Sequence, residues 1–303
     1  MRKFITIFSG FILIGLSGCQ IQKVSQPVPV TATAQVLSAQ EAQNKLIAEI
    51  TTKIGNGEVL APQYKKTVQF KDGKYETGSG ADYLLVEMLP QMAVGDLNGD
   101  GQTDAAVLLA ENGGGSGVFV SLVPFISTGS GFTEAQAVLI DDRPRINALT
   151  IQDGKISLDA LIHGADDSMA SPSMKVVETY TFSGDALTLT AFSSAINGTE
   201  HSIKIDTVSQ KDAAGDLEVK GSMPVAPIEN QLRYRIYAAN GQVLLNEGPF
   251  TVKSEDVGKP GTFDNSLKLT NIASGTKVRF ELAELSAKDG SPLCMSSVEL
   301  TVK

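Results

Sequence analysis

The residues best suited to chemistry lie in one acidic segment, Asp96-Leu97-Asn98-Gly99-Asp100-Gly101-Gln102-Thr103-Asp104. Oxygen-bearing side chains occupy positions 1, 3, 5 and 9 of this loop, and a glycine occupies position 6. Ca²⁺ binds six to eight oxygens about 2.3–2.6 Å away, and this odd-numbered spacing around a sharp turn points oxygens inward. The segment therefore predicts a calcium site formed by Asp96, Asn98, Asp100, Asp104 and, through its backbone carbonyl, Gln102.

This loop resembles the calcium loops of dockerins, integrin-type propeller repeats and EF-hands. It departs from EF-hands at position 12, where Val107 replaces the bidentate glutamate. It also occurs only once, so neither cohesin binding nor a full propeller is implied. Four side-chain ligands and a carbonyl would leave little of the ion for substrate, so a structural role is expected. The alternative is a solvated turn that binds nothing, since Asp, Asn and Gly are common turn formers.

A second set of acidic residues could form an acid–base or metal site. It comprises the pairs Asp141-Asp142 and Asp166-Asp167, together with Asp159 and His163. Paired carboxylates can separate their pKa values for catalysis. Adjacent strand residues point to opposite faces, however, and both pairs fall at expected loops. We therefore predict no catalytic residues, and an envelope hydrolase that uses the acidic loop residues is the alternative hypothesis.

Other catalytic motifs are missing from the sequence. The chain has two histidines, His163 and His201, and contains neither a G-x-S-x-G elbow nor a His-Glu-x-x-His helix. The glycine-rich segment 112–117 lacks the Lys-Ser/Thr of a phosphate-binding loop and precedes a β-type run. It therefore indicates a hairpin loop or bulge.

The N-terminal sequence predicts export. Two basic residues precede an apolar stretch over 4–16 that is too short to span a bilayer. Leu16-Ser17-Gly18-Cys19 resembles the bacterial lipobox, which implies cleavage of a signal peptide over 1–18 and attachment of acyl chains such as palmitate to Cys19. The lipid would hold the protein to a membrane on its extracytoplasmic side, in the cell envelope. The alternatives are an ordinary secretory signal cut near Gly18 or an uncleaved anchor.

Charge and cysteine content limit the partners. The formal net charge is −9, and cleavage after residue 18 removes Arg2 and Lys3, which gives −9 − 2 = −11. Such an acidic protein repels nucleic acid and anionic lipid surfaces, so the lipid rather than charge would hold it at a membrane. With Cys19 lipidated, Cys294 has no partner for a disulfide within the chain. Stability must then come from packing, to which a metal ion could add.

Sequence periodicity indicates a mainly β protein with one leading helix. A proline-containing tether is expected over 19–37, followed by a helix over about 39–54 with Ser38 and Glu41 as a capping box. Beyond the helix the apolar period changes to two. Asp153-Gly154 and Gly184-Asp185 indicate two hairpins. The first, β-rich domain is expected over 38–195, with a boundary near 193–200.

The C-terminal region, 200–303, contains six to eight short strand-like runs separated by turn signals, which favours an antiparallel β-sandwich. Segments 277–285 and 286–291 resemble the final hairpin of the immunoglobulin-like domain of bacterial spore-germination proteins. Segments 232–237 and 261–263, with Asn240-Gly241, fit the same domain. The resemblance implies a β-sandwich outside the cytoplasm and brings no catalytic residues with it.

Together these features favour a lipid-anchored binding or scaffolding module, stabilised by calcium. Its partners would be the membrane, through the lipid anchor, and an envelope protein or glycan. A purely structural lipoprotein without a small ligand is a further possibility.

Overall fold

The described part of the chain is mainly β-structure with one α-helix at its N-terminal end, as the sequence predicts. The computed structural model describes residues 30–210, 216–238, 243–256 and 258–303. Strands that neighbour each other in the sheets pair in the antiparallel direction. The chain divides into two compact units, Met1–Lys45 and Leu46–Lys303, and the second holds all of the described sheets.

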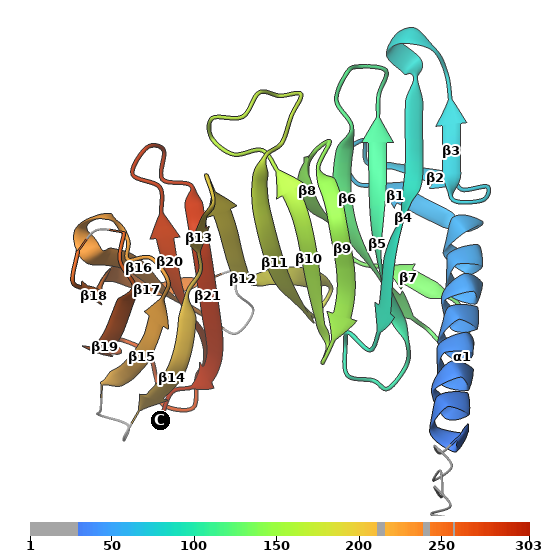
Figure 1. Cartoon of the computed structure of the whole chain (residues 1–303). Coiled ribbons are helices and arrows are strands. Elements are labelled where there is room, and N and C mark those ends of the chain that lie inside the picture. The colour runs from blue at the N-terminus through green and yellow to red at the C-terminus, as the bar shows by residue number, and fades with distance from the viewer. Residues whose placement is uncertain (1–29, 211–215, 239–242, 257) are drawn as a thin grey trace, which may run out of the picture. The chain divides into compact units, whose positions relative to one another are not determined.

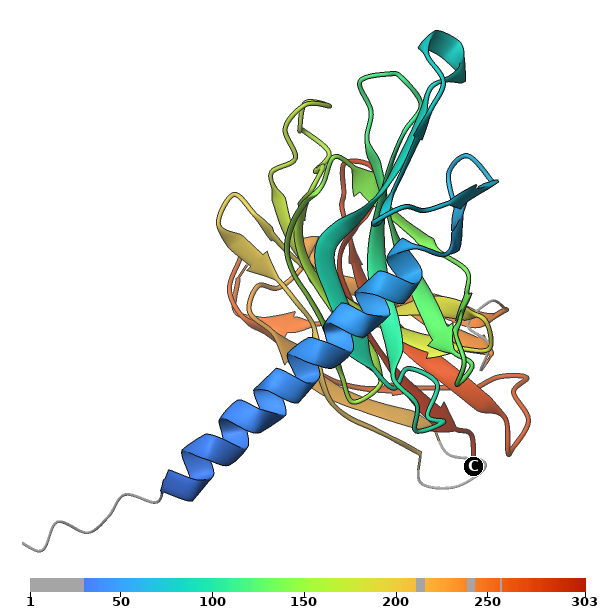
Figure 2. The ribbon, with the colours of Figure 1, turned by 90° about the vertical axis from the view of Figure 1, so that its right-hand side faces the viewer.

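The helix α1 spans Val30–Gly55 and is drawn without interruption in Figures 1 and 2. It ends at the predicted glycine but begins well before residue 39, so Ser38 lies inside it rather than at its N-cap. Residues 30–37, predicted as tether, are therefore helical. The last proline is Pro29, and no glycine or proline follows in the next ten residues to stop a helix. The rest of the predicted tether and Cys19 lie outside the described residues.

The C-terminal half of α1 packs on the sheets through Ile50 and Ile54, which are buried in a core with strand residues such as Val107. Leu46, predicted on the same face, is 38% exposed. No helix among the described residues is both long and apolar enough to cross a membrane.

The N-terminal strands form two sheets, and the 96–104 loop connects two strands of the larger one. A two-stranded sheet contains β1 (Glu58–Ala61) and β2 (Lys66–Gln69), and a short 3-10 turn spans Gly80–Asp82. A six-stranded sheet has the order β3-β4-β5-β6-β7, and β8 also pairs with β6. The bounds of its strands are β3 (Lys74–Thr77), β4 (Leu84–Gly95), β5 (Asp104–Asn112), β6 (Phe119–Ser127), β7 (Phe132–Glu134) and β8 (Val138–Asp142).

Strand β5 lies between two hydrophobic cores. Its even-numbered residues, such as Leu108, belong to one buried cluster, and its odd-numbered residues, such as Val107 and Leu109, belong to another. A strand buried on both faces reads as a continuous apolar run, as β5 does. Because Gly95 pairs with Asp104, the 96–104 loop closes the β4–β5 hairpin directly onto this buried strand.

The two predicted hairpins are present. Strand β9 (Arg145–Gln152) turns into β10 (Lys155–Ile162), and β11 (Met174–Ser183) turns into β12 (Ala186–Ile196). Asp153 and Gly154 both have positive φ, 51° and 71°, as a two-residue turn of the primed type requires.

The C-terminal strands form the rest of a nine-stranded sheet and a four-stranded sheet. The large sheet has the order β17-β16-β20-β21-β12-β11-β10-β9, with β13 paired to β12, and the smaller one has the order β14-β15-β19-β18. The remaining bounds are β13 (Thr199–His201), β14 (Lys204–Gln210), β15 (Leu217–Met223), β16 (Gln231–Ala238), β17 (Leu244–Thr251), β18 (Lys253–Ser254), β19 (Gly261–Leu267), β20 (Lys277–Leu285) and β21 (Pro292–Thr301), with a 3-10 turn over Ile228–Asn230.

The large sheet continues across the predicted domain boundary near 193–200. Strand β12 pairs with β21 through Ala191–Ser296 and Phe192–Met295. Phe192 and Met295 also share one core cluster with residues of β5 and β10. A separate cluster lies between the four-stranded sheet and strands β16, β20 and β21. The C-terminal region thus has its own core and yet extends the sheet of the first region.

Candidate functional site

Hydrogen bonds to backbone N–H groups hold the 96–104 loop in a compact turn. Asp96 Oδ1 accepts from the Gly99 N–H at 2.7 Å, and Asp96 Oδ2 accepts from the Gly101 N–H at 2.8 Å. Gly99 and Gly101 have φ of +79° and +81°, so any other residue at either position would strain the turn. Asp100 Oδ1 accepts a hydrogen bond from the Gln102 N–H at 2.7 Å. This bond is the largest cause of the lowered pKa of the Asp100 carboxyl.

Asp104 anchors the loop from the start of β5, where its side chain is fully buried. Its Oδ2 accepts the Leu97 N–H and its Oδ1 accepts the Ser127 N–H, both at 2.8 Å. Gln102 also reaches the β6 end, where the Ser127 hydroxyl donates to its Oε1 at 3.1 Å. The carboxylate therefore joins the loop to two neighbouring strands.

The five predicted calcium ligands have suitable donor types, because carboxylate and amide oxygens are the ligands that Ca²⁺ prefers. The carboxylates of Asp96, Asp100 and Asp104 are turned toward N–H donors. Within the described part of the chain, no group of three or more His, Cys, Asp or Glu side chains is arranged to hold a metal. Asp100 Oδ2 also accepts from the Asn98 and Gln102 side-chain amides at 3.0 and 3.3 Å, so these bonds would have to open for the loop to coordinate an ion.

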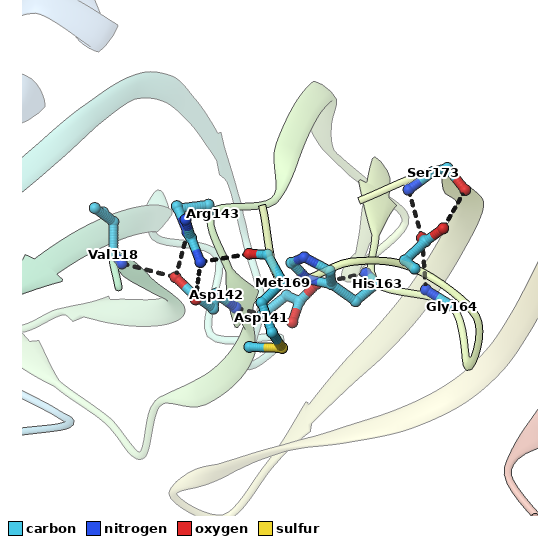
Figure 3. Close-up of polar contacts among 9 residues, drawn as sticks. Val118, Asp141, Asp142, Arg143, His163, Gly164, Met169 and Ser173 are labelled. Atoms are coloured by element: carbon cyan, nitrogen blue, oxygen red, sulfur yellow. Dashed lines mark hydrogen bonds and ion pairs between the residues drawn. The ribbon is translucent and has the colours of Figure 1, made fainter. Parts of the chain in front are cut away.

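Figure 3 shows the second candidate region, where the end of β8 meets the loop after β10. Asp141 Oδ2 accepts the backbone N–H of His163 at 2.6 Å and lies 2.8 Å from His163 Nδ1. His163 Nε2 is buried and has no hydrogen-bond partner among the described residues. Asp141 and His163 thus form a dyad that sequence reasoning placed in the same set without pairing them.

Asp142 does not join that dyad, because it is the partner of Arg143. Its carboxylate accepts from the Arg143 Nε and Nη2 at 3.0 and 2.7 Å and from the Val118 N–H at 2.7 Å (Figure 3). The Arg143 hydrogen bond is the largest cause that lowers the pKa of Asp142. Arg143 also donates to the Met169 carbonyl. These contacts close the β8–β9 turn onto the loop after β10.

The remaining predicted acidic residues are dispersed. Asp167 accepts from the Ser173 hydroxyl and from the Ser173 and Gly164 N–H groups, and these bonds lower its pKa to about 2. Asp166 forms an ion pair with Lys288. Asp159 lies elsewhere, where Asn147 Nδ2 donates to it at 2.9 Å. Asp159 therefore lies apart from His163, Asp166 and Asp167, and the carboxylates of Asp166 and Asp167 are already bound to other residues.

A pocket of about 1120 Å³, which we call the sheet-face pocket, lies across the junction of β12 and β21. Its floor contains Phe192, Ala283 and Met295, all less than 10% exposed. Arg279 and Glu281 continue the same face of β20, because side chains alternate between the two faces of a strand. The neighbouring residues of β20 point instead into the C-terminal core.

Polar groups of the first region and of the C-terminal region line the edge of this pocket. Asp166, Asp167 and His163 lie on the side of the first region, and Arg235 and Lys288 lie on the C-terminal side. Sequence reasoning missed the arginines and Glu281. Charges at alternate positions of β16 and β20 are visible in the sequence, but they also fit an ordinary solvated strand face. Only the pairing of β12 with β21 shows that these charged residues line a pocket and not an open strand face.

A comparison with known protein families, characterised proteins and solved structures finds no match. The function must therefore be argued from the geometry of the site.

Two further predicted features have clear structural roles. The glycine-rich segment links β5 to β6 as a hairpin loop, in which the Asn112 amide donates to the Gly115 and Gly117 carbonyls.

Cys294 is a buried free thiol, and burial raises its pKa far above the ordinary value. Since the thiolate is the reactive form, this thiol is unsuited to nucleophilic chemistry.

Proposed function

We propose that this protein is a lipid-anchored binding module of the cell envelope and that its sheet-face pocket takes a small ligand. The observation that carries the proposal is the pocket itself. Small-molecule sites are concave, have volumes of roughly 300–1,000 Å³, and combine an apolar lining with a few polar groups. The floor of Phe192, Ala283 and Met295, edged by Arg279 and Glu281, has this character.

Binding accounts for the polar groups better than hydrolysis does. A general acid or base must be free to exchange a proton with substrate. Asp167 accepts three hydrogen bonds from its own loop and Asp166 is ion-paired, so neither carboxylate is available. His163 Nε2 has no partner among the described residues, but it is buried. The hydrolase alternative therefore has little support from geometry.

The strand order supports the immunoglobulin-like assignment of 200–303. Immunoglobulin-type sandwiches place strands A, B, E and D in one sheet and C, F and G in the other. Lettered in chain order from β14, the four-stranded sheet reads A-B-E-D, and β17-β16-β20-β21 reads C′-C-F-G. The core between these strands fits two sheets packed face to face. We propose that this β-sandwich presents the outer face of its C′-C-F-G sheet to the pocket.

The anchor and the ion complete the proposal. Acyl chains on Cys19 would hold the module to the extracytoplasmic side of a membrane, and more than one chain is needed for stable attachment. A calcium ion held by the 96–104 loop would fix the β4–β5 connection onto the buried strand β5. In this role the ion stabilises the protein, and the five loop residues supply its ligands.

The calcium part predicts a stability gain. Millimolar Ca²⁺, compared with EDTA, is expected to raise the melting temperature of the protein, because an ion at 100 times its Kd adds about 2.7 kcal/mol. Asp100→Ala, which removes an exposed loop carboxylate, should abolish most of this gain. Asp185→Ala, which removes an exposed carboxylate at the β11–β12 turn, should leave it unchanged. Thermal unfolding of the three proteins tests this, and an equal response to Ca²⁺ in all of them would refute it.

The pocket part predicts a ligand that copurifies. Ala195 lines the pocket and is partly exposed, so Ala195→Trp would fill the space without replacing a core residue. Native mass spectrometry of the exported protein should show a bound small molecule in the wild type that is reduced in Ala195→Trp. Ala148→Trp, on the exposed face of β9, is the control and should retain the ligand. Equal ligand loads in the two tryptophan variants would contradict the assignment.

A further inference from the structure

We propose that the ligand of the sheet-face pocket is an amphipathic anion, with an apolar body on the pocket floor and a carboxylate or phosphate on Arg279. This inference rests on the proposed function of the pocket and names the chemical class that it takes. Its starting point is an arginine that is buried at the pocket with incomplete hydrogen bonding.

Arg279 is held rigidly beside the pocket. Its side chain is 7% exposed, its Nη1 donates to Glu281 Oε2 at 2.7 Å, and its guanidinium lies over the Tyr237 ring at 4.6 Å from the ring centre. Its Nε, however, is buried without a hydrogen-bond partner among the described residues. Buried polar groups are nearly always paired, so an unpaired donor on a fixed cation indicates a missing acceptor. A ligand oxygen would supply that acceptor.

The local charge favours an anion. Glu281 is shared by two guanidinium groups, with Arg235 Nη1 at 3.2 Å from its Oε1 and Arg279 at its Oε2. Glu247 lies 3.8 Å from Arg235 Nε, but it is 43% exposed and also pairs with Arg233. Among the residues that line this end of the pocket, Arg235 and Arg279 therefore share one carboxylate, that of Glu281. An excess positive charge is costly where water is scarce, and a bound anion would offset it.

The acidic groups that line the pocket already have partners. Asp166 pairs with Lys288, Asp167 is bonded within its loop, and Asp289 accepts from the Ser291 N–H and hydroxyl. Glu178 accepts from the Tyr180 hydroxyl at 2.8 Å, and burial raises the pKa of Glu178, which favours its neutral form. These groups therefore leave the arginine end as the place where an extra charge is needed.

The spacing along β20 sets the length of the ligand. Ala283, on the floor, and Arg279 are four residues apart on one face, which corresponds to about 13 Å at 3.3 Å per residue. Ala283 also pairs with Met295, so the floor continues onto β21. A chain of about ten methylenes reaches from the floor to the guanidinium. Dodecanoate is therefore a suitable probe, and dodecyltrimethylammonium is its match with the opposite charge.

The test uses the chain from residue 19 onward carrying Cys19→Ala, which lacks both the apolar 4–16 segment and the acyl chains and needs no detergent, and isothermal titration with each probe below its micelle-forming concentration. Dodecanoate should bind at least tenfold more tightly than dodecyltrimethylammonium. Arg279→Met should weaken dodecanoate binding at least tenfold, while Arg233→Met, on the same sheet but outside the pocket lining, should leave it unchanged. Arg279→Lys keeps the charge and loses the Nε donor, so it should give an intermediate loss.

Each other result overturns part of the account. Equal binding of both probes, with no effect of Arg279→Met, would leave a binding pocket but exclude an anionic ligand. No binding of either probe, with no displacement of the copurified molecule, would contradict the amphipathic class. If the wild type also carries no copurified molecule, the proposed binding function fails as well. Arg279→Met could unfold the sheet, so the thermal unfolding of this variant is measured first. If the variant is unfolded, the binding of dodecanoate to Arg279→Lys decides the test.

Discussion

Asp104→Ala is expected to lower the free energy of unfolding by about 3 kcal/mol or more, because each buried N–H left without an acceptor costs roughly 1–3 kcal/mol. The substitution removes the acceptors of the Leu97 and Ser127 N–H groups at once. It also leaves a space at a fully buried position between β4, β5 and β6. The loop would then lose its connection to the neighbouring strands.

Urea unfolding in EDTA measures this effect apart from any bound ion. Asp104→Asn keeps the shape and one oxygen acceptor, so it should cost about half as much as Asp104→Ala. Asp185→Ala is the control and should change the free energy of unfolding by less than about 0.5 kcal/mol, as surface substitutions do. A loss below about 1 kcal/mol for Asp104→Ala would show that its two hydrogen bonds do not hold the loop.

Glu111→Gln is expected to stabilise the protein above neutral pH. Glu111 is fully buried at the end of β5, where its Oε2 accepts the Gln63 N–H at 3.1 Å. Burial is the largest cause that raises its pKa, to about 7, and the nearby Glu134, whose pKa is also raised by its own burial, adds to the shift. The ionised carboxylate of Glu111 is therefore destabilised in the folded protein. The glutamine amide is neutral and keeps an oxygen for the backbone donor.

The pH dependence follows from the two pKa values of Glu111. The unfolded chain releases this proton near 4.5, whereas the folded protein holds it until about 7. Between these values the native state binds more protons, so this group makes stability fall as pH rises, and its cost is complete above about 7. The difference between 4.5 and about 7 corresponds to about 3–4 kcal/mol. Asp167, whose pKa is lowered, makes stability rise with pH, and it does so only at much lower pH.

Melting temperatures of the wild type and Glu111→Gln between pH 5 and 8 test this prediction. The wild type should lose stability across the range, and the variant should lose less and be the more stable protein at pH 8. Glu87→Gln, at an exposed position of β4, is the control and should follow the wild type. Parallel curves for the wild type and Glu111→Gln would contradict the assignment.

Local sequence patterns predicted most of the β-structure, because hairpins depend on turn chemistry. Asp153-Gly154 and Gly184-Asp185 form turns where they were expected, since both pairs of flanking strands are adjacent in sequence. Strand β17 was harder to predict. Gly248 and Pro249 both disfavour a strand, yet the structure continues β17 through them as an edge strand, where proline is tolerated.

The start of the helix and the continuation of the large sheet across residues 193–200 could not be predicted by the same reasoning. Ser38 and Glu41 match the sequence pattern of a capping box, but the preceding residues also allow a helix, so α1 extends back to Val30. The sheet continues across residues 193–200 because Phe192 pairs with Met295. These residues are more than 100 positions apart, and no local pattern specifies that contact.

The same distinction applies to the candidate site. The 96–104 loop is a local motif, so its residues and its tight turn were predictable, although the two buried bonds of Asp104 were not. The sheet-face pocket brings β12 together with β20 and β21, so Arg279 and Glu281 could not be identified from spacing alone.

Methionine methyl NMR tests the central claim, a binding site at the sheet-face pocket, most directly. Met174 and Met295 line the pocket, whereas Met88, Met92 and Met223 lie in the other cores and serve as internal controls. Adding the small-molecule extract of the cell envelope should shift the Met174 and Met295 resonances and leave the three control resonances in place. Unchanged Met174 and Met295 resonances, or equal shifts at all five methionines, would contradict the account.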